Sequence, residues 1–196
     1  MSDRAPLDAY WTPDALALAC TSLVVTELGP RLRPYPDATP LRVVEPSVGG
    51  GAWVRALRYY GAAVHACDLD PAAPGLALAD SHHVGSYLDD QARRPADLAL
   101  GNPPYCDPVQ SWVAAALRDA PWVAYLLRSS VLGSRGRSGW WAAHPPEVVW
   151  VLSPRPRWEG PGAQPSSDTH DPVLVLWGAR PAVGTELRWW DWGGGR

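Results

Sequence analysis

The sequence predicts an α/β protein with a single, doubly wound and mostly parallel β-sheet, helices on both of its faces, and one or more antiparallel strands near the C-terminus. Strand-like and helix-like segments alternate through the first two thirds of the chain, which is typical of a parallel sheet covered on both sides. The length of 196 residues and the hydrophobic fraction of 46% suit one core. We therefore expect residues 1–196 to form a single domain.

The first half of the chain is expected to contain two helices and four strands. Thr12, Pro13 and Asp14 are a typical helix start, with Thr12 as the N-cap, and Gly29 ends this helix after about Leu28. Short apolar runs predict the strands that follow. The remaining elements are expected at residues 41–45 (strand), 52–60 (helix), 63–67 (strand), 83–88 (strand) and 97–100 (strand).

The second half of the chain is expected to continue the alternation and then to end in strands. The expected elements are residues 108–118 (helix), 122–127, 147–152 and 172–177 (strands) and 189–192 (a short edge strand). Residues 153–171 form a proline-containing loop between two of these strands. Loops of that length in compact domains are usually functional. We therefore expect residues 153–171 to face the substrate.

Polar side chains stand at or just beyond the ends of three predicted strands. These side chains are Glu45, Asp68 and Asn102. In open parallel sheets, ligands bind in the crevice at the carboxyl ends of the strands. We therefore expect the three side chains to converge on one edge of the sheet, where a ligand would bind.

Asn102 is the only asparagine in the chain and lies in the segment Gly101-Asn-Pro-Pro-Tyr105. The Asn102 side-chain oxygen and the Pro103 carbonyl can both accept hydrogen bonds from one planar NH₂ group, and the Tyr105 ring can stack on the heterocycle that carries it. The two prolines restrict the backbone and hold these acceptors in place. A rigid β-turn with no ligand is the alternative interpretation of the same residues.

The glycine run and the acid after the second strand also indicate a ligand site. Glycines 49–51 let the backbone approach a ligand closely at a helix N-terminus, although an ordinary tight turn explains them as well. Asp68 is placed to accept hydrogen bonds from ribose hydroxyls, or else to cap a helix. Asp70, which precedes Pro71, is the better candidate for that cap.

Three segments together resemble the Rossmann-like S-adenosylmethionine-dependent methyltransferases that modify the amino group of adenine. The segments are Glu45-Pro-Ser-Val-Gly-Gly-Gly51, Asp68-Leu-Asp-Pro71 and Asn102-Pro-Pro-Tyr105. Tyr10-Trp-Thr-Pro13 is similar to the family's N-terminal motif at the methionine end of the cofactor. Further segments look like small bacteriophage-type N6-adenine DNA methyltransferases, namely residues 126–132, residues 153–158, Asp168 and residues 173–177.

The resemblance implies a role for each matching residue. The implied catalytic residues are Asn102, Pro103, Pro104 and Tyr105. The implied cofactor is S-adenosylmethionine, and the residues implied to bind it are Tyr10, Thr12, Glu45, Pro46, Ser47, Gly49, Gly51, Asp68, Leu69, Ser86, Tyr87 and Asn102. Substrate contacts are expected from Arg128, Arg135, Arg137, Arg155, Arg157 and Trp158. The implied reaction needs an amino nitrogen held in line with the activated methyl group, and an adenine taken out of its helix.

The chain departs from the family pattern in two ways. Members usually have an acid near the third strand that accepts from the amino group of the cofactor's adenine, whereas this sequence offers Ser86, a weaker acceptor. We also expect no separate target-recognition domain, so recognition of a base sequence would depend on the arginine-rich segments or on another subunit.

Charge is distributed unevenly along the chain. Residues 59–127 contain eight acids and three arginines, a net charge of −5, whereas residues 128–157 contain five arginines and one glutamate, a net charge of +4. All 17 basic side chains are arginine, whose planar fork suits phosphate. The asymmetry suits a polyanionic substrate at one edge of the molecule, and the resemblance implies that this substrate is a nucleic acid, with an adenine in DNA as the target. A solvated surface is an equally good interpretation of the arginines.

Other functions remain open at this stage. Adenine in ribosomal RNA and the glutamine amide of a release factor also present a planar NH₂ group, although the glutamine enzymes usually carry a helical N-terminal domain and only about 40 residues precede Leu41. A non-catalytic relative that binds nucleic acid is a further alternative, which Ser86 keeps open. The cysteines and histidines lack ligand spacing, so we expect no metal. No apolar run is long enough for a membrane span and no signal peptide is visible, so we expect a cytoplasmic protein.

Overall fold

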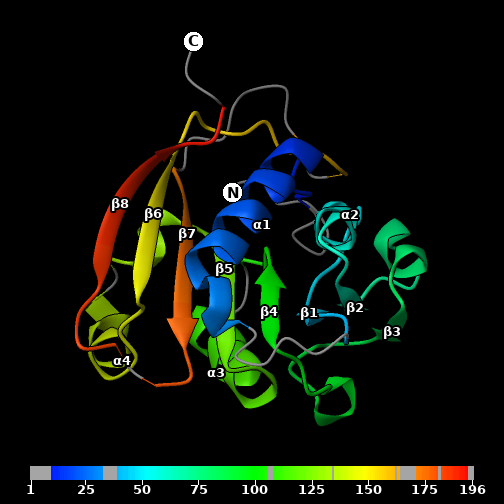
Figure 1. The fold of residues 1–196 in the computed structure, drawn as a ribbon, viewed down its shortest axis with the longest axis horizontal. Coiled ribbons are helices and arrows are strands. Elements are labelled where there is room, and N and C mark those ends of the chain that lie inside the picture. The colour runs from blue at the N-terminus through cyan, green and yellow to red at the C-terminus, as the bar shows by residue number, and fades with distance from the viewer. Residues whose placement is uncertain are drawn as a thin grey trace.

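An eight-stranded β-sheet is the centre of the structure, which is a computed structural model (Figure 1). It describes residues 10–32, 39–105, 108–133, 135–161, 163, 171–180 and 182–193. The strands lie in the order β3-β2-β1-β4-β5-β7-β6-β8. Their bounds are β1 Arg42–Glu45, β2 Ala63–Asp68, β3 Ser81–Val84, β4 Leu98–Gly101, β5 Trp122–Arg128, β6 Val148–Ser153, β7 Pro172–Gly178 and β8 Glu186–Asp191.

One strand of the sheet runs against all the others. β7 pairs antiparallel with β5 on one side and with β6 on the other, and every other strand pair is parallel. The predicted fold class is therefore confirmed, including the antiparallel strand near the C-terminus. The edge strand expected at 189–192 is β8, which begins three residues earlier and pairs with β6.

Helices cover both faces of the sheet and divide the core into two layers. On one face, α1 (Asp14–Leu28) and α2 (Ala52–Tyr59) bury Leu16, Trp53 and their neighbours against the strands. On the other face, α3 (Val109–Asp119) and α4 (Ser138–Ala143) pack on a second cluster that includes Trp112 and Trp177. In Figure 1, α1 crosses in front of the sheet.

Two local expectations were wrong, and one helix was not predicted. Thr12 does not cap α1: Pro13 holds the N-cap position, and the Thr12 hydroxyl instead accepts a hydrogen bond from the Trp53 indole. The third strand covers 81–84 rather than 83–88, because the chain turns at Gly85 with φ +150°. Helix α4 was not expected, since glycine and proline flank its aromatic residues.

The glycine run after β1 forms a tight turn with left-handed backbone at two positions. Gly49 has φ +46° and Gly51 has φ +82°, a region that side chains other than glycine rarely adopt. Gly51 also packs on Gly75, so a Cβ at residue 51 would lie 2.8 Å from the Gly75 Cα. The turn thus brings the start of α2 close to β2 and its following loop.

The described residues contain neither a membrane-spanning helix nor a metal-type cluster. None of the helices in that part of the chain is both long and apolar enough to cross a bilayer. Nor does any cluster of three histidine, cysteine or carboxylate side chains there have a metal-binding arrangement.

Candidate active site

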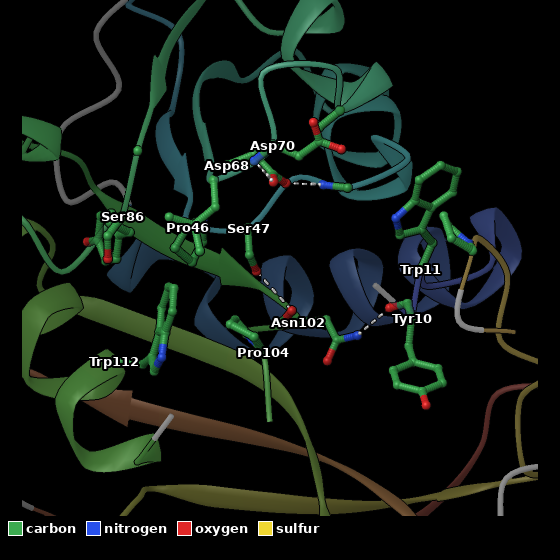
Figure 2. A pocket seen from close by; sticks show the side chains of 16 residues that line it. Tyr10, Trp11, Pro46, Ser47, Asp68, Asp70, Ser86, Asn102, Pro104 and Trp112 are labelled. Carbon is green, nitrogen blue, oxygen red and sulfur yellow. Dashed lines mark hydrogen bonds between the residues drawn. The ribbon is translucent and has the colours of Figure 1, made fainter. Parts of the chain in front are cut away.

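A cavity of about 110 Å³ lies at the carboxyl ends of β1, β2 and β4 (Figure 2). Nine of the residues predicted to bind a cofactor line it: Tyr10, Pro46, Ser47, Gly49, Asp68, Leu69, Ser86, Tyr87 and Asn102. In Figure 2, Asn102 and Tyr10 lie at one end of the cavity and Ser86 and Trp112 at the other. The expected convergence of strand ends therefore produces an open site for Asp68 and Asn102.

Asn102 is held by hydrogen bonds at three atoms. Its backbone carbonyl accepts from the Ser47 hydroxyl at 2.9 Å. Its side-chain Nδ2 donates to the Tyr10 carbonyl at 3.5 Å, and its Oδ1 accepts from the Tyr105 hydroxyl at 2.8 Å. With Nδ2 directed at a carbonyl, Oδ1 is the acceptor that remains for a ligand, because an amide oxygen has two lone pairs.

Asp68 ties the glycine turn to the end of β2. One carboxylate oxygen accepts from the Gly49 backbone N–H at 2.8 Å, and the other accepts from the Asp70 N–H at 2.9 Å. Asp70 in turn accepts from the Ala72 N–H within a turn, and it is not the helix cap expected of it, because the next helical segment has Ala73 at its N-cap position. Each Asp68 oxygen retains a further lone pair, so this carboxylate can still accept from a polar ligand.

Ser86, Tyr87 and Trp112 form the far end of the cavity. The Ser86 hydroxyl accepts from the Leu88 N–H at 3.2 Å. The Tyr87 ring stacks on Trp112 with centroids 6.0 Å apart, and its hydroxyl donates to Asp119 at 2.8 Å. Burial raises the Tyr87 pKa far above its ordinary value, so this phenol remains protonated. The end wall is therefore rigid, aromatic and neutral.

Glu45 lies beneath the cavity rather than in its wall. Its side chain is fully buried, and Oε1 accepts from the Ser47 N–H at 3.2 Å. Burial raises the Glu45 pKa well above its ordinary value, the Ser47 contact opposes the rise, and the nearby Asp68 charge adds to it. Glu45 thus supports the turn that carries Ser47.

Two other residues predicted to bind the cofactor, Thr12 and Gly51, also do not line the first cavity. Thr12 is buried against Trp53 and borders only a small neighbouring cavity, and Gly51 packs behind the turn on Gly75. Both residues shape the glycine turn and the chain around it.

A second cavity of about 150 Å³ adjoins the first and shares Pro104 and Trp112 with it. The predicted catalytic residues Pro103 and Tyr105 line this second cavity, together with Arg128 and Arg137. The Asn-Pro-Pro-Tyr turn therefore stands between two hollows. The first is bordered by Asp68 and the glycine turn, and the second by two arginines.

Of the remaining predicted substrate residues, none is a lining residue of either cavity. Arg155 pairs with Asp171, so this ion pair joins the two ends of the long loop. Trp158 is partly buried against the core layer of α1, Arg157 is exposed beside it, and Arg135 is exposed next to α4. Asp168 lies outside the described residues.

The long loop nevertheless reaches the first cavity through residues that the sequence did not single out. Trp11 and Glu159 exchange two backbone hydrogen bonds of 2.9 Å. The Trp11 ring packs on Gly49, where a Cβ would lie 2.7 Å from Cδ1. Pro161 and Trp11 both line the cavity. Residues 159–161 of the loop thus border one side of this cavity.

Comparisons with known proteins identify the fold of this chain through solved structures alone. No family profile and no curated protein matches this sequence. Solved structures do match: a protein of Pyrococcus horikoshii described as a putative RNA methyltransferase has a TM-score of 0.65 at 15% identity, and the match covers 88% of each chain. The chain has the class I methyltransferase fold.

Two further structures with this fold match most of this chain but differ in how much of their own length the match covers. A human methyltransferase 10 domain containing protein has a TM-score of 0.55 at 12% identity, covering 87% of this chain and 86% of that one. DrdV, solved in complex with DNA, has a TM-score of 0.68 at 13% identity. The match covers 95% of this chain but 28% of DrdV.

Proposed function

We propose that this protein transfers a methyl group from S-adenosylmethionine to the exocyclic amino group of adenine in DNA. The observation that carries the proposal is the position of Asn102. Its amide borders the first cavity, is fixed by Tyr10 and Tyr105, and belongs to a turn whose next residues line the second cavity. A donor molecule in one hollow and a planar amino group in the other would meet at this amide.

The residues of the first cavity suit S-adenosylmethionine. The Asp68 carboxylate can accept from ribose hydroxyls, and Leu69, which is 56% exposed at the cavity wall, offers an apolar surface for a base. Ser86 offers a neutral acceptor near Trp112. When bound, the cofactor supplies a methyl group that its sulfonium charge already activates.

The chain's own task is to orient the accepting nitrogen. Asn102 Oδ1 and the Pro103 carbonyl would accept its two hydrogens, which favours a lone pair directed at the methyl donor. Tyr105 would stack on the base, an interaction worth roughly 1–3 kcal/mol. No side chain has to remove a proton before transfer, because the methylated nitrogen can lose its extra proton to solvent afterwards.

Several features support a nucleic acid as the methyl acceptor. Two arginines line the second cavity, and the surrounding segment carries a net positive charge. Structures with the same fold include one bound to DNA and one described as a putative RNA methyltransferase. Adenine in ribosomal RNA is the second candidate, because it presents the same amino group. A release-factor glutamine is a weaker candidate, since the arginines have no role toward it.

Transfer of a labelled methyl group separates these functions. We expect purified protein and labelled S-adenosylmethionine to mark unmethylated duplex DNA, and the label to be recovered as N6-methyladenine. Label found only in RNA or only in release factor would change the substrate assignment. Cofactor binding with no label in any of the three would support the non-catalytic alternative and overturn the proposal.

A further inference from the structure

Arg128 lines the cavity in which the proposed substrate base would bind. It is the last residue of β5 and lines the second cavity beside Tyr105. Its guanidinium carbon lies 4.4 Å from the centroid of the Tyr105 ring and 6.0 Å from that of Tyr10. These two tyrosines are also the residues that hold the Asn102 amide. One cation therefore contacts both supports of the proposed catalytic group.

The guanidinium covers the surface that a substrate ring would need. Arg128 and Tyr105 both line the second cavity, and the guanidinium lies over one face of the Tyr105 ring. A planar base stacks at van der Waals distance from an aromatic ring, which leaves no room for a guanidinium in between. A base that stacks on this face of Tyr105 therefore requires Arg128 to move away.

A phosphodiester provides the means to move Arg128. Arginine binds phosphate oxygens through two parallel charge-assisted hydrogen bonds, which are stronger than a cation–π contact in partly exposed surroundings. Arg137 lines the same cavity and is anchored by the carbonyls of Val131 and Ser130 at 3.1 and 3.5 Å. It thus supplies a second, fixed positive charge beside Arg128.

We propose that Arg128 is a specificity-determining residue that makes the Tyr105 stacking site accessible only to a ring attached to a phosphodiester. The inference rests on the proposed function and deepens it. A phosphate next to the target nucleoside draws the guanidinium off Tyr105 and then holds it at the backbone. A free nucleoside or a glutamine side chain carries no such group, and the cation continues to cover the ring.

The test compares one base with and without its phosphodiester. The ratio of kcat/KM for a short single-adenine DNA oligonucleotide to kcat/KM for free deoxyadenosine is measured in wild type and in Arg128→Ala. We expect the ratio to fall by at least about tenfold in the variant, the size of one charged hydrogen-bond contact. A matching RNA oligonucleotide and adenosine form a second arm, which identifies the nucleic acid that the wild-type protein prefers.

Two variants keep the test decisive. Arg58→Ala removes an exposed arginine of α2 that pairs with Asp80. We expect the kcat/KM ratio of this variant to equal that of wild type. Arg128→Lys keeps a cation without the planar fork, so its ratio should lie between those of wild type and Arg128→Ala. If Arg128→Ala does not fold, the lysine variant is compared with wild type in the same way.

The outcomes distinguish this inference from the function on which it rests. An unchanged ratio in Arg128→Ala, or equal losses on oligonucleotide and nucleoside, would overturn the role of Arg128 while methyl transfer by wild type still stood. Absence of transfer to every adenine substrate by wild-type protein would instead overturn the proposed function itself.

Discussion

The Tyr105 hydroxyl donates a 2.8 Å hydrogen bond to Oδ1 of Asn102, three residues earlier in the chain. The bond connects the proposed stacking ring to the proposed acceptor, so the two groups of the Asn-Pro-Pro-Tyr turn are positioned together. Because the Asn102 Nδ2 donates to the Tyr10 carbonyl, the orientation of the amide is fixed from both sides.

Removal of only the Tyr105 hydroxyl should affect turnover more than binding. In Tyr105→Phe the ring remains, but Asn102 loses one of the contacts that orient its amide, a loss of about 0.5–1.5 kcal/mol. We expect kcat to fall roughly 3- to 10-fold, with KM for DNA nearly unchanged. Tyr105→Ala also removes the stacking ring and should weaken DNA binding. Equal kinetics of the Phe variant and wild type would show that the hydroxyl does not position Asn102.

Substitution of Gly49 should disturb the site as well as the fold. Gly49 has φ +46°, and a Cβ there would lie 2.7 Å from Trp11. Gly61 is the matched control, because its φ is +70° and nothing lies within 4 Å of its Cβ position. Gly61→Ala should cost about 1–2 kcal/mol of unfolding free energy, the conformational penalty alone.

Gly49→Ala should lose a similar amount of unfolding free energy and should also displace Trp11. It should therefore weaken binding of S-adenosylmethionine as well. Denaturant unfolding and calorimetric titration of both variants provide the comparison. If the two variants bound cofactor equally well, the Trp11 contact would have no part in the site.

Glu45 should make stability depend on pH. Its pKa is raised in the folded protein by burial, so the folded state binds a proton that the unfolded state releases near the ordinary glutamate value. The contribution of Glu45 to stability is therefore complete at low pH and is lost as the pH rises above that value.

Glu45→Gln lacks this dependence because its amide does not ionise. We expect the variant to gain stability relative to wild type as the pH is raised from 4 to 8, as measured by denaturant unfolding at each pH. A difference that stays constant with pH would show that Glu45 is not held neutral in the fold.

The long loop should contribute to DNA affinity through charge. Arg155→Ala combined with Arg157→Ala should lower the slope of log K against log salt by roughly 1–2, because each lost phosphate contact removes about 0.9. Arg58→Ala is the control for the loss of a positive charge, since Arg58 is an exposed arginine outside the long loop and pairs with Asp80. A slope unchanged from wild type would remove both loop arginines from the interface.

Much of the sheet and part of the site could be predicted because they follow from local patterns. Short apolar strands with polar residues at their carboxyl ends are sufficient to place Asp68 and Asn102 at one edge. Glu45 shows the limit of that reasoning. Its side chain turns beneath the cavity, where Oε1 lies against the Gly101 backbone, and the position of a residue in sequence does not reveal that direction.

Residues whose position depends on long-range packing could not be predicted. The chain contains 12 tryptophans, and of the two that line the cavity only Trp11 lies in a motif that the sequence singled out. Trp11 is placed by backbone pairing with Glu159, far along the chain, and Trp112 by stacking on Tyr87. The Arg155–Asp171 pair likewise forms only when the loop ends meet.

Methyl transfer by Asn102→Ala, measured beside cofactor binding by the same variant, tests the central claim most directly. If the Asn102 amide orients the accepting nitrogen, transfer to adenine in DNA should fall by roughly 10²- to 10³-fold, as when one preorganised catalytic hydrogen bond is lost. The affinity for S-adenosylmethionine should stay within a few-fold of wild type. Transfer that persists near the wild-type rate, or cofactor binding that disappears together with transfer, would contradict the account.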